Sequence, residues 1–196
     1  MTAHDAFAEI GEDVRIFPLA KILGHDRITI ASHVIIDDFV FIGNNEKLVL
    51  GNHVHIASHA SITGGGQCIC CDFSGIASGA RILTGTDRFQ GGGLTGPTIP
   101  AEFRAVQRGK VVIGAHAIIG ANAVVLPDIA IGEGATVGAG SVVTHDLAPW
   151  GIYAGVPAQR IGTRRSEEIL ELERRLVAQE NIGARRFRST DALRIA

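Results

Sequence analysis

An aliphatic residue recurs every six positions over much of this chain, and that period constrains the fold more than any other feature. In the second half it falls on Ile113, Ile119, Val125, Ile131, Val137 and Val143. An α-helix would show spacings of three and four, and a hairpin strand would alternate briefly and then turn. A six-residue period sustained over six units instead indicates an all-β fold, a parallel β-helix of hexapeptide repeats.

The first half keeps this period with one regular variation. Its inward positions are Ile30, Ile36, Ile42, Leu50, Ile56, Ile62, Cys70, Ile76 and Ile82. Every third step is eight residues long, so three repeats make one coil and one corner of each early coil carries two extra residues. The period then breaks until Ile113, so segment 83–110 leaves the β-helix from that same corner.

The register also predicts side-chain directions, because side chains alternate between the two faces of a strand. Cys68 and Cys70 fall on inward positions and Cys71 on an outward one. The three cysteines show neither the CxxC spacing nor the second cluster of a zinc site. We therefore expect them to be structural.

Composition changes after the last repeat. We expect an N-terminal segment over 1–15, the β-helix over 16–162, and a C-terminal α-helix and tail over 163–196. Ser166 can cap this helix and Gly183 can end it. The helix carries an apolar stripe that we expect to pack on the β-helix or on a neighbour, formed by Ile169, Leu172 and Leu176.

The overall composition narrows the classes of function. The chain is 46% hydrophobic and 19% charged, as in globular proteins, and its net charge of −2 argues against general nucleic-acid binding. No apolar run is long enough for membrane insertion, and the N-terminus lacks the basic and apolar regions of a signal peptide. A cytoplasmic protein is expected.

Segment 113–161, with the motifs GAGSVVT and AGVPA, resembles the C-terminal half of sugar O-acetyltransferases of the maltose, galactoside and xenobiotic type. Segment 54–110 is similar to acyltransferases of surface-polysaccharide gene sets, and the resemblance covers roughly 16–162. It implies a left-handed β-helix and a homotrimer with active sites between protomers. It also implies acetyl-CoA along the outer wall. Segment 83–110 is too long for a simple connection between repeats, so we expect it to reach an adjacent protomer and shape the acceptor pocket. No metal is expected.

The same resemblance suggests residues for coenzyme A. It places Ala121, Ala139, Thr144 and His145 beside the cofactor. Arg160 and Arg164 follow shortly afterwards and can supply positive charge to its phosphates.

Direct attack of an acceptor on a thioester calls for a general base, for which histidine suits neutral pH. Alignment with the galactoside and maltose enzymes, which the chain resembles, places Asp87 at the position of their catalytic histidine. The resemblance therefore implies that the usual base is absent. His55 and His59 flank Ala57, which aligns with a substrate-binding asparagine. His55 should point outward with Asp37 one coil earlier as its orienting group, so His55 is our first candidate base and His59 the second. Asp87 would pair with a neighbouring chain's histidine or hold the acceptor.

The leading expectation is acetyl transfer to a sugar hydroxyl, in surface polysaccharide biosynthesis. The alternative is N-acetylation of a nucleotide-linked amino sugar, because an amine needs less help from a base and this would suit the missing histidine. A reading of another class, a non-catalytic or metal-binding scaffold, rests on the corner histidines His33, His53 and His116.

Overall fold

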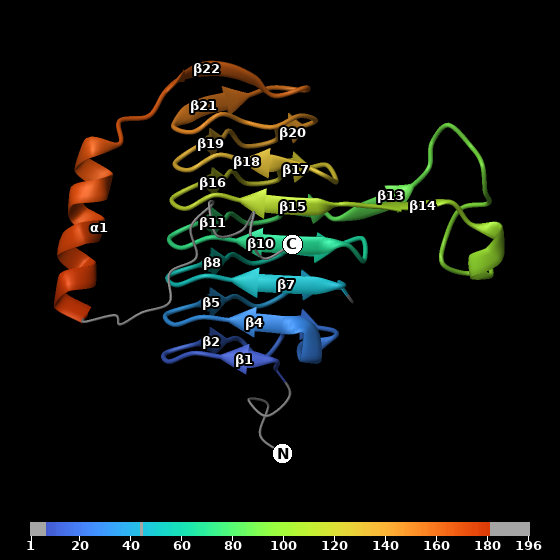
Figure 1. Cartoon of the computed structure of the whole chain (residues 1–196), viewed down its shortest axis with the longest axis horizontal. Coiled ribbons are helices and arrows are strands. Elements are labelled where there is room, and N and C mark those ends of the chain that lie inside the picture. The colour runs from blue at the N-terminus through green and yellow to red at the C-terminus, as the bar shows by residue number, and fades with distance from the viewer. Residues whose placement is uncertain (1–6, 44, 181–196) are drawn as a thin grey trace.

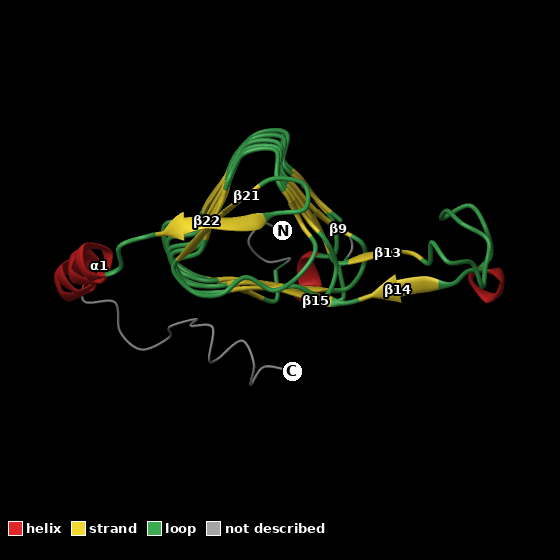
Figure 2. Ribbon diagram, turned by 90° about the horizontal axis from the view of Figure 1, so that it is seen from above, coloured by secondary structure: helices red, strands yellow, loops and turns green. Residues whose placement is uncertain are grey.

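The structure is a computed structural model that describes residues 7–43 and 45–180. The chain winds into a left-handed parallel β-helix of triangular cross-section, with an arm on one side and a helix on another (Figures 1 and 2). This confirms the fold class expected from the period. None of the helices in the described residues is long and apolar enough to cross a membrane.

Three parallel sheets form the walls. Sheet A contains β1 (Glu9–Ile10), β4 (Ile28–Ile30), β7 (Lys47–Leu50), β10 (Gln67–Cys70), β15 (Lys110–Ile113) and β18 (Ala130–Ile131). Sheet B contains β2 (Arg15–Ile16), β5 (Ile35–Ile36), β8 (His55–Ile56), β11 (Gly75–Ile76), β16 (Ile118–Ile119), β19 (Thr136–Val137), β21 (Gly151–Ala154) and the antiparallel β22 (Gln159–Thr163). Sheet C contains β3 (Lys21–Ile22), β6 (Phe41–Ile42), β9 (Ser61–Thr63), β12 (Arg81–Leu83), β17 (Val124–Val125) and β20 (Val142–Val143). A 3₁₀ turn, η2 (His25–Arg27), precedes β4, and the first coil begins at Glu9, ahead of the boundary expected at residue 16.

The predicted inward positions form the core. In sheet B, for example, Ile36, Ile56, Ile76 and Ile119 pair coil on coil, and each is at most 1% exposed. Burying one such side chain contributes about 1.5–3 kcal/mol, so the stacked column stabilises each coil through its neighbours.

Ile119→Ala should lower the free energy of unfolding by about 2–5 kcal/mol, because the cavity left between coils cannot close. Ile118→Ala is the matched control, since Ile118 adjoins Ile119 on the same strand and is 40% exposed. Denaturant unfolding measures both variants, and equal losses would show that the inward register does not govern stability.

The cysteines are structural, as expected. The sulfurs of Cys68 and Cys70 lie 4.0 Å apart inside the core, and the hydrogen bond with Cys68, together with burial, raises the pKa of the Cys70 thiol. Cys71 belongs to a second, smaller buried cluster with Val49, Ile69 and Val112. Its outward position therefore does not expose it to solvent.

Segment 83–110 leaves between sheets C and A and forms an arm (Figure 2). Its stem pairs β13 (Gly85–Asp87) antiparallel with β14 (Val106–Arg108), and its tip contains the 3₁₀ turn η3 (Ala101–Phe103). The fully buried Thr84 fixes the root: its hydroxyl lies 2.9 Å from Oδ1 of Asn45 and accepts a 3.0 Å hydrogen bond from Gly66 N–H.

A column of rings fills the corner between sheets A and B. Consecutive ring centroids lie 4.7, 4.8, 5.0 and 6.2 Å apart along His33, His53, Phe73, His116 and Trp150. All five residues have a positive φ of 56–61°, a conformation that non-glycine residues seldom adopt. Stacking of the rings offsets part of that strain.

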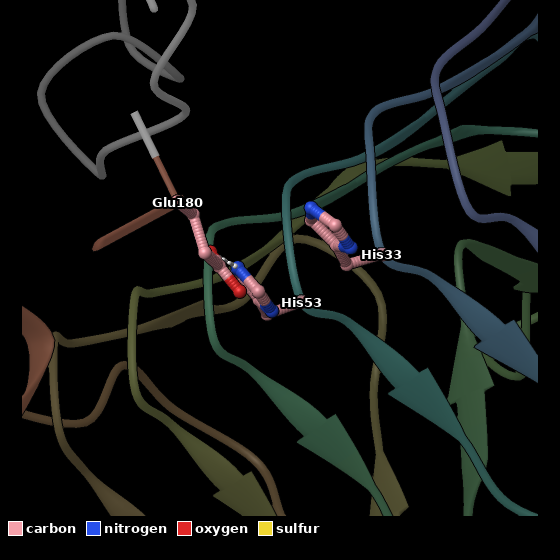
Figure 3. Close-up of side chains that lie close together, drawn as sticks. All are labelled: His33, His53 and Glu180. Atoms are coloured by element: carbon pink, nitrogen blue, oxygen red, sulfur yellow. Dashed lines mark hydrogen bonds and ion pairs between the residues drawn. The ribbon is translucent and has the colours of Figure 1, made fainter. Parts of the chain in front are cut away.

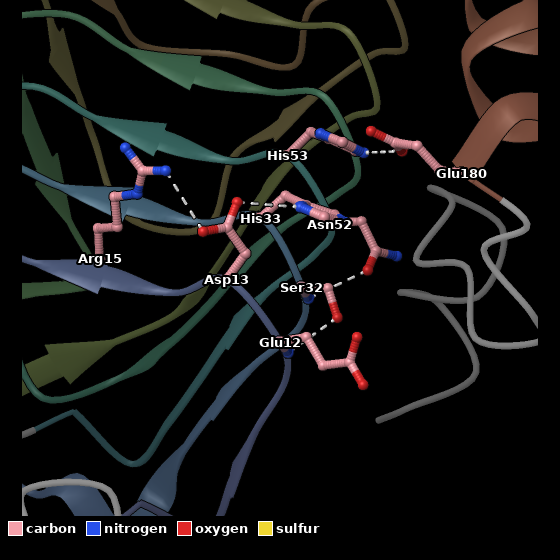
Figure 4. A network of polar contacts seen from close by, with 8 residues as sticks. All are labelled: Glu12, Asp13, Arg15, Ser32, His33, Asn52, His53 and Glu180. Atoms are coloured by element: carbon pink, nitrogen blue, oxygen red, sulfur yellow. Dashed lines mark hydrogen bonds and ion pairs between the residues drawn. The ribbon is translucent and has the colours of Figure 1, made fainter.

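Helix α1 (Glu167–Glu180) attaches to this column through carboxylates. Nε2 of His116 lies 2.9 Å from Oε2 of Glu173 with both side chains buried, and Nε2 of His53 lies 2.9 Å from Oε2 of Glu180 (Figures 3 and 4). Leu172 of the predicted apolar stripe does not pack on the β-helix of its own chain: it is 57% exposed, and the helix turns Glu173 toward the β-helix. Packing of this stripe on a neighbouring chain stays a prediction. Gly183 lies outside the described residues.

His116→Ala should loosen α1 by about 3–5 kcal/mol, since it leaves the Glu173 carboxylate buried without this partner. Faster hydrogen exchange confined to 167–180 is the expected result. The double variant His116→Phe with Glu173→Leu, which extends the ring column and removes both polar groups, should restore slow exchange. Unchanged exchange in His116→Ala would contradict an anchoring role.

Candidate active site

His55 and Asp37 form a pair on the outer face of sheet B. His55 opens β8 and Asp37 follows β5 directly below it, so the parallel register brings them together. Nε2 of His55 lies 3.0 Å from Oδ2 of Asp37, with the imidazole 52% exposed. One coil above, a Cβ built on Gly75 would meet nothing within 4 Å, so the space above the ring is open. A carboxylate that accepts from Nε2–H leaves Nδ1 as the proton acceptor, which is the arrangement of a base and its orienting group.

His59 has a different environment. It occupies the next corner, between sheets B and C, and its ring stacks on Phe39 at a centroid distance of 5.0 Å. Its carbonyl accepts a 2.6 Å hydrogen bond from Nη1 of Arg81. Ala57, between the two histidines, is 8% exposed and offers a ligand very little surface. The two candidate bases therefore differ in their neighbours: His55 contacts a carboxylate, whereas His59 stacks on an aromatic ring.

Asp87 ends β13 on the arm. Its Oδ2 accepts a 3.1 Å hydrogen bond from Gly96 N–H, which ties the stem to the loop at the tip. The arm leaves between sheets C and A whereas His55 lies on sheet B, so one chain does not bring Asp87 and His55 together (Figure 2).

The positions expected for coenzyme A lie in the turns of the upper coils. Ala121 and Ala139 follow β16 and β19 on consecutive coils, and Gly140 N–H donates to the Ala121 carbonyl at 2.8 Å. Thr144 and His145 follow β20, are exposed, and contact each other through Oγ1 and Nδ1 at 3.3 Å. The small residues leave a flat surface here, which a thin ligand can approach closely.

The two arginines expected to meet phosphate differ. Arg160 is exposed and donates within its own strand, to the Gly162 carbonyl at 3.3 Å and the Thr163 hydroxyl at 3.1 Å. Arg164 donates to the carbonyls of His116 and Gly134 at 2.7 and 3.2 Å, and burial lowers its pKa. These contacts hold Arg164 against the corner that carries His116, just before α1 begins, and a role of Arg164 at phosphate stays a prediction.

The corner histidines do not form the trio that a metal scaffold would need, because Phe73 lies between His53 and His116. His33, His53 and Glu180 each have one possible metal-ligand atom, and these three atoms lie within 4.8 Å of one another (Figure 3). However, the rings of His33 and His53 are nearly parallel, at 12°, so their lone pairs run side by side and do not converge as tetrahedral coordination requires.

Both of these rings already have acidic neighbours. His33 Nδ1 faces Asp13 at 3.3 Å and His53 faces Glu180 (Figure 4). The hydrogen bond from His33, with Arg15 beside it, lowers the pKa of Asp13. This geometry favours a structural column.

Comparison with known proteins decides the family. The model "Bacterial transferase hexapeptide (six repeats)" matches residues 110–145. A dTDP-4-amino-4,6-dideoxy-D-glucose acyltransferase from Escherichia coli is 38% identical over 168 residues, covering 85% of this chain and 87% of the relative. The chain belongs to the hexapeptide-repeat acyltransferases. It is an enzyme of that family.

Solved structures of other hexapeptide-repeat acyltransferases agree. AntD, an N-acyltransferase from Bacillus cereus in complex with dTDP and 3-hydroxybutyryl-CoA, is 37% identical with a TM-score of 0.84, covering 90% of this chain and 93% of AntD. A maltose O-acetyltransferase from Clostridium difficile 630 is 20% identical with a TM-score of 0.56, covering 83% and 73%, and supports the fold alone. The comparisons therefore favour the amino-sugar alternative over the leading expectation of O-acetylation.

The sequence reading missed two sets of residues. It did not single out Glu173, the buried contact of α1, or three arginines of the arm, Arg88, Arg104 and Arg108. Glu173 has no local signal, since its partner lies 57 residues away. The arginines could have been noticed as basic residues close to the glycine triplet at 91–93.

Proposed function

We propose that this enzyme transfers an acyl group from acyl-CoA to the amino group of a nucleotide-linked amino sugar. The observation that carries the proposal is 38% identity, over 85% of the chain, to an enzyme named for acylating dTDP-4-amino-4,6-dideoxy-D-glucose. AntD, bound to dTDP and an acyl-CoA, supports both the acceptor class and the donor. Acetyl is one candidate acyl group and 3-hydroxybutyryl, present in the AntD complex, is another. A cytoplasmic role in supplying sugars for surface polysaccharide fits such a product.

The chemistry is direct transfer. The unprotonated amine attacks the thioester carbonyl, the carbon–sulfur bond breaks with its electron pair on sulfur, and coenzyme A leaves as the thiolate while the nitrogen loses a proton. The base then gives up that proton, which converts the thiolate to the thiol. His55, oriented by Asp37 at 3.0 Å, is the proposed acceptor of that proton through Nδ1. Asp87 and His59 are the competing candidates.

The donor site is proposed along the upper coils. The pantetheine arm would lie against the small residues Ala121 and Ala139, with Thr144 and His145 near its polar groups and Arg160 near its phosphates. In a homotrimer with active sites between protomers, the arm of one chain would bring its Asp87 to the sheet B surface of the next. This arrangement would unite residues that a single chain keeps apart.

The substrate assignment is tested with a matched pair of acceptors, dTDP-4-amino-4,6-dideoxyglucose and dTDP-6-deoxyglucose, which carries a hydroxyl in place of the amine. Each is incubated with acetyl-CoA or 3-hydroxybutyryl-CoA, with free thiol and product mass as the readouts. Turnover with the amine alone is expected. Turnover of the hydroxyl acceptor or of maltose, with the amine inert, would return the enzyme to O-acetylation.

His55→Ala should lower kcat by about 10²–10⁴-fold, the usual contribution of a general base, with the KM for acyl-CoA little changed. Asp37→Asn should cost less, because it removes the orienting charge and keeps the base. His59→Ala and Asp87→Asn are measured alongside over a range of pH. Normal turnover in His55→Ala, with a loss in either of the other two, would move the base to that residue.

A further inference from the structure

The arm contains two hollows that share Arg88. One, of about 420 Å³, is lined by Arg88, Ala105, Val106, Gln107 and Arg108. The other, of about 450 Å³, is lined by Arg88, Gln90, Gly91 and Gly92. The backbone N–H of Arg88 donates a 2.9 Å hydrogen bond to the Ala105 carbonyl and so continues the β13–β14 pairing by one residue. This bond fixes the position of Arg88 between the strand and the loop that follows it.

The three arginines of the arm have no ion-pair partner among the residues that the structure describes. The arm also carries two carboxylates, Asp87 and Glu102, and neither forms an ion pair with these arginines in the described part of the chain. Asp87, next to Arg88, uses one carboxylate oxygen for Gly96 N–H. In addition, Nε of Arg104 is buried and has no hydrogen-bond partner in this part of the chain. A desolvated cationic donor is costly to leave unpaired, so an anionic ligand would stabilise it.

Glycines shape the loop beside Arg88. Gly91 and Gly92 have φ values of 92° and 95°, which residues with a Cβ rarely adopt. Gly93 packs so closely that a Cβ there would lie 2.4 Å from the Ala105 nitrogen. These constraints hold the loop against the start of β14, and Arg88 lines the hollow on each side of this contact.

We propose that Arg88 and Arg108, which line one hollow together, bind the diphosphate of the nucleotide-linked sugar, and that the unpaired Arg104, next to Ala105 in the chain, adds positive charge nearby. This inference rests on the function proposed above. Two joined phosphates present several oxygens to arginine side chains, and the guanidinium group matches phosphate geometry with paired N–H donors. The surface proposed for coenzyme A belongs to the turns of the upper coils, a different part of the molecule. The arm therefore recognises the acceptor, and the coils hold the donor.

The test is calorimetric titration of the full chain with dTDP and, separately, with coenzyme A. Arg88 and Arg108 are exposed, so their substitution should leave the fold intact. Arg88→Ala should raise the Kd for dTDP about tenfold, equivalent to one lost charge-assisted contact, and Arg88→Ala with Arg108→Ala should raise it further. Arg88→Lys should recover part of the affinity. Arg174→Ala, an equal loss of charge on α1, is the control and should change nothing.

Steady-state kinetics supplies a second readout. The double variant should show a higher KM for the nucleotide amino sugar, with kcat and the KM for acyl-CoA close to those of the unsubstituted enzyme. An unchanged Kd for dTDP in the double variant overturns the inference, and so does a loss of affinity for coenzyme A with dTDP binding intact. An unsubstituted enzyme that binds no dTDP refutes the proposed function and this inference together, whereas dTDP binding that is indifferent to the arginines refutes only the inference.

Discussion

Everything in this molecule depends on coils that pair in register with the coils above and below. The short strands of the coils hydrogen-bond to the strands above and below, and each inward side chain stacks on its equivalents in the common core, as Ile56 does on Ile36 and Ile76. The pairing also fixes what the outer wall presents. Asp37, His55 and the open position at Gly75 lie together on the outer wall because parallel coils repeat the same direction at each step.

For that reason the fold and one half of the site could be predicted from the sequence. The six-residue period predicted for each residue of the coils whether its side chain points inward or outward. It therefore predicted that His55 points outward, with Asp37 on the same face one coil earlier. The pairing at 3.0 Å agrees with that expectation. The role of the pair as base and orienting group stays a prediction.

The parts that interrupt the repeat could not be predicted in the same way. The heptad-like stripe of 167–180 identifies an apolar face but does not reveal what lies next to the helix. The structure places Glu173 against His116, a contact across 57 residues, and leaves Leu172 exposed. Likewise the arm has no period, so the sequence showed where it leaves the coils but not that β13 and β14 would bring Arg88 and Arg108 to one hollow.

The contrast between the regular coils and the segments that interrupt them also explains the outcome of the family resemblance. The resemblance indicated acyl transfer, but it pointed to a sugar hydroxyl as the acceptor, which the comparisons favour less than an amine. The motifs that carry it, GAGSVVT and AGVPA, lie in the upper coils, where the donor is proposed to bind, and such motifs do not report on the acceptor. The acceptor is proposed to be recognised by sheet B and by the arm, which lie outside these motifs. The relative at 38% identity covers these regions too, and it acts on an amino sugar.

The proposed amine acceptor would also account for the missing histidine that the resemblance implies. A hydroxyl has to lose its proton as it attacks, so its base must act in the transition state. An unprotonated amine attacks with its own lone pair and becomes acidic only afterwards, so the proton can leave to a base that is weaker or less closely aligned. If Asp87 replaces the usual histidine, as the resemblance implies, the change would hinder O-acetylation and be tolerable for N-acylation, in keeping with the acceptor that the comparisons favour.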